Sequence, residues 1–355
     1  MRKLRRINML NLYIHELKKL LSTPALWVFV LLCLAFNISN FPRWLRNADF
    51  DTSTPYLYNV FETHNTTEIG ETYITALNLS GRTADRMRAK YAALQYTADA
   101  AATFGYSYAS YFGTPTQLMH INLFHGVAGV LGRLLMQGML LSALLALLAV
   151  GYEQINNTEH TIYATKTGRR ILRHKIAAGI VAGVGAYALL ATITLAAYFI
   201  MFDFSGVWGS SVSSGFNYIV NIMGTRPFTT WRSFTVLSYF LASLSLGLGL
   251  VICFSLMGVI IGSLSKNGYI GFLMLVLVNA VCFALPLVIP RHLYAYFIPF
   301  HTPIWLWWNS HLWFTDGSVI TLWRNFELWG LGISLLTLAA LCVLAVKNFE
   351  KRNIA

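Results

Sequence analysis

The chain has 355 residues, of which 56% are hydrophobic and only 11% are charged. Soluble domains carry roughly a quarter charged residues, so this composition excludes a soluble multi-domain protein. The formal net charge of +12 is explained by basic segments beside anionic lipid. We therefore expect membrane lipid, and no nucleic acid, among the partners.

The N-terminal segment 1–22 is predicted to be an amphipathic helix on the cytoplasmic surface of a membrane. Its apolar residues recur at steps of three and four, and its basic residues lie mostly off that stripe. The stripe consists of Ile7, Leu10, Ile14, Leu17 and Leu21. Pro24 follows at the expected start of the next helix, because proline is favoured in the first turn.

Six apolar stretches reach the length of about 20 residues that a transmembrane helix needs. They predict an all-α integral membrane protein with six spans, at 23–42, 126–152, 176–202, 233–262, 269–290 and 326–346. The start of the second span stays open, because Arg133 fits the outer membrane surface while the helix itself can begin nearer His120.

Lys and Arg are most dense in the segments 1–22, 153–175 and 347–355. The positive-inside rule assigns such segments to the cytoplasm. Both termini are therefore expected to be cytoplasmic, in a plasma (inner) membrane of the bacterial type.

Three segments are then extracytoplasmic, 43–125, 203–232 and 291–325. The first far exceeds the usual connection of about five residues, so it is expected to form a small domain. One helix in it would bury a face made of Met87, Tyr91, Leu94 and Ala98. The third contains five tryptophans, which is typical of an interfacial or re-entrant segment.

Small residues and isolated amides occur inside the predicted spans. Pairs of glycines four residues apart let helix backbones approach closely, and they occur at Gly179 and Gly183 and at Gly258 and Gly262. Gln137 and Asn279 are polar groups within spans. They either line a translocation path or bond to a neighbouring helix, and the sequence leaves both interpretations open.

The sequence contains few groups that could perform chemistry inside the membrane. Asp203 and Glu327 lie only at the outer ends of spans, so coupling to an ion through a central carboxylate is not supported. His292, His301 and His311 are nine and ten residues apart and share no helical face, so no metal site is predicted. The chain also lacks a Gly-rich phosphate-binding loop. We predict no catalytic residues, and any energy must come from a partner.

The segment from Glu153 to Lys175 is the most informative part of the sequence. It has a glutamate where the second span ends, a polar stretch suited to a short helix, a Thr-x-x-Gly-Arg element at 165–169 and a lysine where the third span begins. This pattern resembles the signature of ABC-2 type exporter permeases. It departs from the commoner form at Glu159-His160, where Gly-Thr is frequent, and at 166–168, where a proline version is frequent.

The resemblance implies a permease subunit that pairs with a second permease, as a homodimer or a heterodimer, and docks cytosolic ATP-binding cassette ATPases. ATP and Mg²⁺ would be bound by those partners and not by this chain. The cargo would be amphipathic, such as a peptide, an antibiotic, a lipid or a glycan. The residues assigned to coupling are Glu153, Ile155, Thr161, Ile162, Thr165, Gly168, Arg169, Arg170 and Lys175.

The roles of individual residues in this loop have alternatives. Glu153 is expected to pair with Arg169 or Arg170, whereas the basic residues can also serve only to fix membrane topology by reaching the headgroups. Two other functions stay open for the whole chain. One is a non-catalytic immunity or sensor protein, and the other is an intramembrane enzyme.

Overall fold

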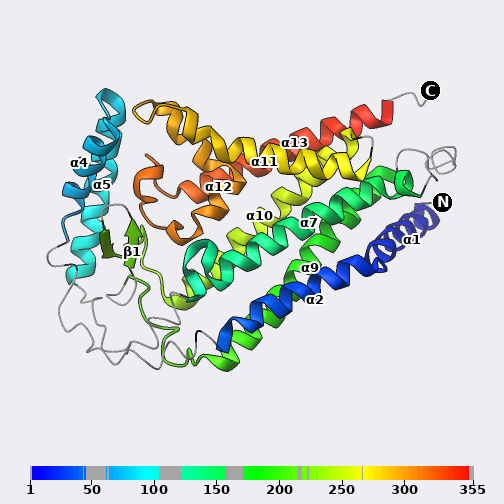
Figure 1. The fold of residues 1–355 in the computed structure, drawn as a ribbon, viewed down its shortest axis with the longest axis horizontal. Coiled ribbons are helices and arrows are strands. Elements are labelled where there is room, and N and C mark those ends of the chain that lie inside the picture. The colour runs from blue at the N-terminus through cyan, green and yellow to red at the C-terminus, as the bar shows by residue number, and fades with distance from the viewer. Residues whose placement is uncertain are drawn as a thin grey trace.

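The structure is a computed structural model, and its fold is almost entirely helical within the residues that it describes (Figure 1). These residues are 2–42, 44, 61, 64–103, 122–156, 158, 171–213, 218–221, 224–265 and 267–351.

Five helices in these ranges are long and apolar enough to cross a membrane. They are α7 (Val130–Ile155), α9 (Ile171–Met201), α10 (Val236–Leu264), α11 (Gly268–Val288) and α13 (Phe326–Lys351). Their composition and length support a multi-pass membrane protein. The helices extend beyond several predicted ends, because a stretch without charges ends at the first charged residue whereas a helix does not have to.

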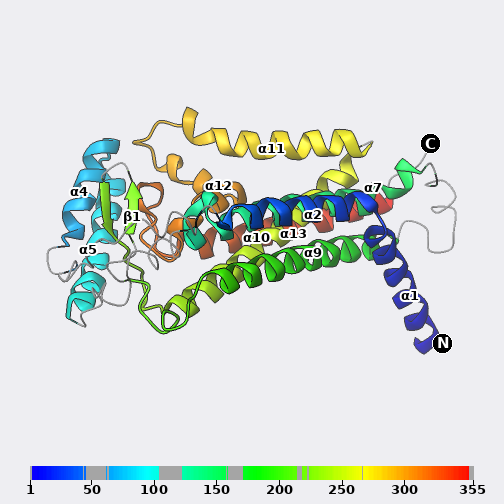
Figure 2. The same ribbon diagram turned by 60° about the horizontal axis from the view of Figure 1, so that its bottom comes forward.

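The predicted first span is the exception. Helix α2 (Pro24–Ser39) has only 16 residues, or about 24 Å at 1.5 Å per residue, which is shorter than a hydrocarbon core of about 30 Å. It reaches the length of a span only together with Asn11–Leu21 of α1 (Arg2–Leu21), from which it is bent by 57°. The bend occurs at Thr23 and Pro24, where a restart was expected. Figure 2 shows α1 leaving the bundle at this point. The position of α1 on a membrane surface stays a prediction.

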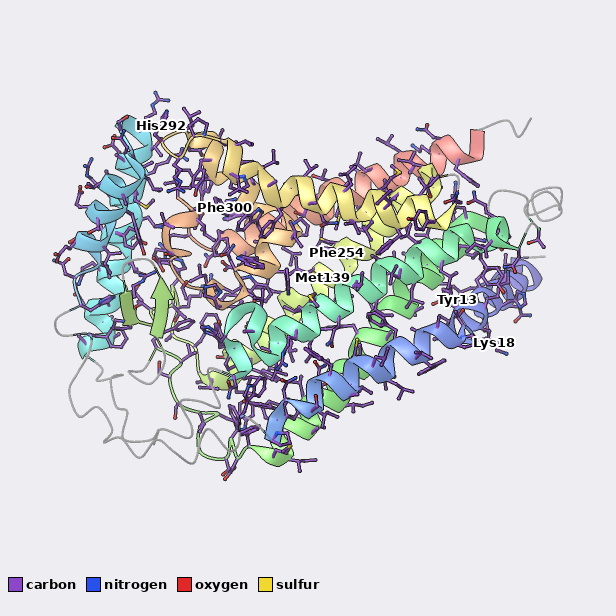
Figure 3. All side chains as sticks on the ribbon, in the orientation of Figure 1. Tyr13, Lys18, Met139, Phe254, His292 and Phe300 are labelled. Atoms are coloured by element: carbon purple, nitrogen blue, oxygen red, sulfur yellow. The ribbon has the colours of Figure 1, made fainter. Side chains whose placement is uncertain are left out.

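Helix α7 lies at the centre of the bundle, and the predicted packing glycines contact it. A Cβ atom added to Gly183 of α9 would lie 2.7 Å from the Cβ of Ser142, and one added to Gly258 of α10 would lie 2.5 Å from the carbonyl oxygen of Ala143. Gly179 and Gly262 face the same helix at wider spacing. Backbones of α9 and α10 therefore approach α7 closely, on either side of its buried surface. The middle of this bundle is marked by Met139 and Phe254 in Figure 3.

The other end of the molecule is a region that we call the cap. It contains α4 (Thr66–Leu77) and α5 (Gly81–Thr103), the antiparallel strands β1 (Tyr218–Asn221) and β2 (Gly224–Pro227), and residues 290–325. The predicted helix face of α5 is buried, since Met87, Tyr91, Leu94 and Ala98 are all fully inaccessible.

The cap differs from the expected small domain in the segment 43–125. Its core combines α4 and α5 with Trp231, Phe297 and Leu322, so three separate parts of the chain build it. The hairpin β1–β2 within 203–232 was not predicted. A pair of helices alone has too little apolar surface to form a stable core, and Trp231 and residues 290–325 supply the rest.

Residues 290–325 cover the cap-side ends of α7, α11 and α13 (Figure 1). They form the short helix α12 (Pro303–Trp308) and several 3₁₀ turns. Two indole N–H groups bind this segment to the bundle. Trp307 Nε1 donates to the carbonyl oxygen of Gly132 at 2.7 Å, and Trp305 Nε1 donates to that of Cys282 at 3.2 Å.

Candidate functional site

At the end of the bundle opposite the cap, four charged side chains from three helices meet. We call this the four-charge cluster; its members are Glu16 and Lys19 of α1, Glu153 of α7 and Lys175 of α9. Glu153 and Lys175 are each only 1% exposed. Two acids and two bases balance one another, as buried charges require.

Glu153 is the centre of this cluster. One carboxylate oxygen forms an ion pair with Lys175, and the other accepts a hydrogen bond from Lys19 Nζ at 3.4 Å. Lys19 Nζ also donates to Glu16 at 2.7 Å, and Lys175 Nζ donates to the carbonyl oxygen of Ala149 at 3.2 Å. The cluster therefore joins α1, the end of α7 and the start of α9.

The positions of Glu153 and Lys175 along their helices favour their pairing. Glu153 lies near the C-terminus of α7 and Lys175 near the N-terminus of α9. A carboxylate at a C-terminus and an ammonium at an N-terminus both oppose the helix dipole. Each is stabilised by the other instead, because the two antiparallel helices place them side by side.

Most of the predicted coupling residues lie outside the residues that the structure describes. These are Thr161, Ile162, Thr165, Gly168, Arg169 and Arg170. Within the described residues, the cations that contact Glu153 are Lys175 and Lys19. The arginines expected for it, Arg169 and Arg170, lie outside these residues, so that pairing stays a prediction. Ile155 is 58% exposed and, with Lys18 and Tyr152, lines a groove of about 500 Å³ beside the bend between α1 and α2.

Sequence reasoning missed the contribution of α1 to this cluster. Lys19 lies 134 residues from Glu153, and no local pattern connects them. The available signal was the spacing of Glu16 and Lys19, which suits an ion pair on one helical turn.

The two amides in the bundle have different environments. Gln137 is buried and exchanges two hydrogen bonds with Asn37 of α2, at 2.8 and 3.0 Å; Asn37 also donates to Thr194 of α9 at 3.3 Å. These bonds link three helices within one chain. Gln137 therefore bonds to a neighbouring helix, which is one of the two interpretations that the sequence left open. Asn279 donates to Leu275 of its own helix at 2.9 Å and lines grooves on two sides of α11.

A second buried charge cluster lies in the cap. Both oxygens of Asp316 accept hydrogen bonds from Arg226 Nη2, at 2.7 and 2.8 Å, and Tyr91 also donates to this carboxylate. Lys90 Nζ donates to three backbone carbonyl oxygens, those of Asp316, Ser318 and Thr321, at 2.7 to 3.1 Å. We call Lys90, Tyr91, Arg226 and Asp316 the cap cluster; its members come from three separate segments.

Burial shifts the pKa values of groups in and near the cap cluster. It lowers the pKa of Lys90 to about 7, against the attraction of Asp316. Burial would raise the pKa of Asp316, but Arg226 and Lys90 more than offset this and hold it below its usual range. His64 has its pKa lowered to about 4, mainly by burial and further by the positive charge of Arg226.

The cap histidines do not converge on one point. His301 packs against Trp323 with ring centroids 5.0 Å apart, whereas His311 lies 6.3 Å from His125. Among the described residues, no group of three or more His, Cys, Asp or Glu side chains is arranged to hold a metal ion.

Comparison with family models, with curated proteins and with solved structures finds no match to this chain. The function is therefore inferred from the residues and their geometry.

Proposed function

We propose that this chain is the permease subunit of an ABC exporter and forms a pathway for an amphipathic cargo. The observation that carries the proposal is the pairing of Glu153 with Lys175, which closes the two ends of the loop whose sequence resembles the coupling segment of ABC-2 permeases. Movement of that loop by a cytosolic ATPase would then act on α7 and α9 together.

The ion pair between Glu153 and Lys175 should transmit a movement of the loop to the helices. Separating a buried ion pair leaves uncompensated charges, which costs about 3–5 kcal/mol. A displacement of the loop is therefore passed on to the helices more readily than it is absorbed at the pair. Lys19 extends the same effect to α1 and thus to the 57° bend before α2.

The location of the termini supports a cytoplasmic partner at this end. The described ends of the chain, the start of α1 and the end of α13, lie at the same end of the bundle as the four-charge cluster, opposite the cap (Figure 1). The described parts of the basic segments 1–22, 153–175 and 347–355 therefore share one end, which the positive-inside rule assigns to the cytoplasm of a bacterial-type inner membrane. Exposed Ile155 and the groove beside it give a soluble ATPase an apolar contact. ATP and Mg²⁺ would be held by that partner, and a second permease copy would complete the pathway.

The test uses the chain co-expressed with an ATP-binding cassette ATPase that copurifies with it and reconstituted in liposomes. Glu153→Gln is expected to leave membrane insertion and complex formation intact but to abolish the stimulation of ATP hydrolysis by cargo. The double variant Glu153→Lys with Lys175→Glu restores an opposite-charge pair and should recover part of it. Asp85→Asn, a control in the cap at a side chain that is 72% exposed, should behave as wild type. Full transport by the chain purified alone would contradict the proposal.

A further inference from the structure

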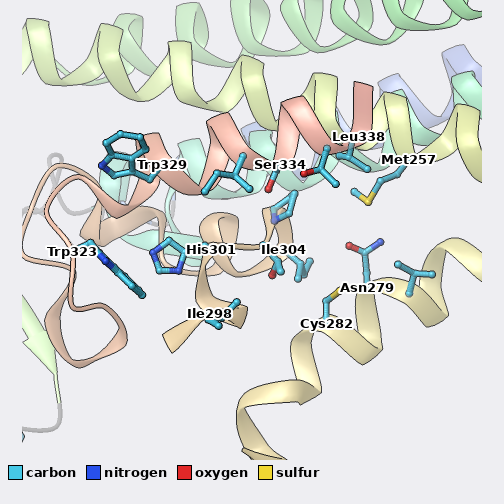
Figure 4. Close-up of a pocket in the computed structure, with 15 residues that line it drawn as sticks. Met257, Asn279, Cys282, Ile298, His301, Ile304, Trp323, Trp329, Ser334 and Leu338 are labelled. Atoms are coloured by element: carbon cyan, nitrogen blue, oxygen red, sulfur yellow. The ribbon is translucent and has the colours of Figure 1, made fainter. Parts of the chain in front are cut away.

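A groove of about 680 Å³ lies between α11 and α13, against α10 and beside α12 (Figure 4). Its lining is almost entirely apolar and includes Met257, Val278, Ile333 and Leu338. Its rim is open, since Ile333 is 60% exposed and Trp329 is 65% exposed. No residue of the four-charge cluster or of the cap cluster lines this groove.

The groove has the depth of one membrane leaflet. Along α13 its lining runs from Trp329, near the cap, to Leu338. Nine residues of helix correspond to about 14 Å, close to half of a hydrocarbon core of about 30 Å. A groove that begins at the membrane surface beside Trp329 would therefore end near the middle of the membrane.

Aromatic groups are concentrated at the cap end of the groove, whereas Asn279, Ser334 and Thr337 add polar groups farther along its walls. His301 and Trp323 line the cap end, with ring centroids 5.0 Å apart. Trp323 also packs edge-on against Tyr294 at 5.3 Å. Tyrosine and tryptophan are favoured at the level of lipid headgroups, so this end matches the position of a headgroup.

The same end carries positive charge. Exposed Arg86 donates to the hydroxyl group of Tyr294 at 2.7 Å, and its guanidinium lies 5.3 Å from that ring. Within the described residues Arg86 forms no ion pair, whereas its neighbour Asp85 is engaged with Arg88. Arg291 is exposed in the same segment as Tyr294. The mouth is thus suited to an anionic group.

We infer that this groove binds one acyl chain of an anionic membrane lipid, with the headgroup held at Arg86 and Tyr294. The apolar groove is about as long as one membrane leaflet is thick, which suits the acyl chain. The cationic and aromatic groups at its mouth suit an anionic headgroup. The binding does not depend on an ATPase or on the proposed exporter function, so the two proposals can fail separately.

The test uses the purified chain in phosphatidylcholine vesicles that contain a trace of phosphatidylglycerol with a photoactivatable diazirine acyl chain. After irradiation, mass spectrometry should locate the label in 278–282 and 329–338. The same diazirine chain on phosphatidylcholine should label these peptides about fivefold less, the ratio expected for about 1 kcal/mol from one cation near the membrane surface. Arg86→Gln should remove this preference.

Groove-filling variants provide the specificity control. Ser334→Trp, from the α13 wall, and Cys282→Trp, from the α11 wall, should each lower labelling severalfold. Leu336→Trp lies on α13 outside the lining, at a side chain that is 76% exposed, and should leave labelling unchanged. Equal labelling by both headgroups with no effect of either filling variant would show bulk lipid contact only and overturn the inference. Crosslinks between two copies at these positions, with no lipid label, would overturn it in favour of an interface between copies.

Discussion

The two buried charge clusters lie at opposite ends of the same helix bundle and are held in different ways. In the cap cluster, Asp316 accepts two bonds from Arg226, and Lys90 is fixed by three backbone carbonyl oxygens. In the four-charge cluster, two contacts join side chains of different helices, Lys19 pairs with Glu16 on α1, and Ala149 supplies a backbone acceptor. Bonds to backbone carbonyl oxygens fix the position of one side chain, whereas ion pairs between helices link the movements of those helices. The cap cluster therefore holds the cap in one position, whereas the four-charge cluster links α1, α7 and α9.

The largest effect is expected from Asp316→Asn in the cap. The substitution leaves the Arg226 guanidinium buried without its counter-charge, which costs about 3–5 kcal/mol. Thermal unfolding in detergent should show a clearly lower midpoint. Asp85→Asn removes a surface pair of 3.5 Å and should change the free energy of unfolding by under about 1 kcal/mol. Equal unfolding midpoints for the two variants would show that Asp316 does not stabilise the cap.

A smaller effect is expected at the other end, because Glu153 has two cationic partners. Lys175→Met leaves Lys19 in place, so the loss should be about 1–3 kcal/mol, that of a charged hydrogen-bond partner. In a double-mutant cycle with Glu153→Gln, the two losses should fall short of additivity by about 0.5–3 kcal/mol. Additive losses would mean that Glu153 and Lys175 do not interact, and would contradict the description of this cluster as a link between helices.

The smallest effect concerns pH and should be confined to the cap. The pKa of His64 is about 4 in the folded protein and 6.5 ordinarily, so between these values the unfolded chain binds the proton and the folded chain does not. The stability contributed by neutral His64 is therefore complete above about pH 6.5 and is lost as the pH falls to about 4, by about 1–2 kcal/mol after allowance for partial exposure.

His64→Gln should flatten this part of the curve of unfolding midpoint against pH, and His292→Gln, at an exposed position, should not. The lowered pKa of Asp316 adds a loss of the same sign at still lower pH. If the unfolding midpoint of His64→Gln falls at acid pH as much as that of the wild type, a group other than His64 causes the loss of stability.

The sequence was sufficient for the long apolar helices but not for the contacts between distant segments. Five of the predicted spans correspond to α7, α9, α10, α11 and α13, because apolar runs of this length have no other stable form. The start of α9 at Ile171 and not at 176 shows the limit of a rule based on charge, since Arg173, His174 and Lys175 continue the helix.

The sites depended on information that a local pattern does not contain. Glu153 and Lys175 were recognisable because they border one loop. In contrast, Lys90 and Arg226 meet residues near 316 that are up to 231 positions away, and Lys19 meets Glu153 across 134. Such pairs are set by how the helices and the cap fold onto one another.

The glycine contacts around α7 have a consequence for any movement of the protein. Where α9 and α10 touch α7 through backbone atoms, there is no side chain that can change rotamer to let the helices slide. These three helices should therefore shift as a rigid block. Only 17% of the apolar window of α11 and of α13 is buried, against 78% of that of α7. Any such movement would then take place as a swing of α11 and α13 against the block.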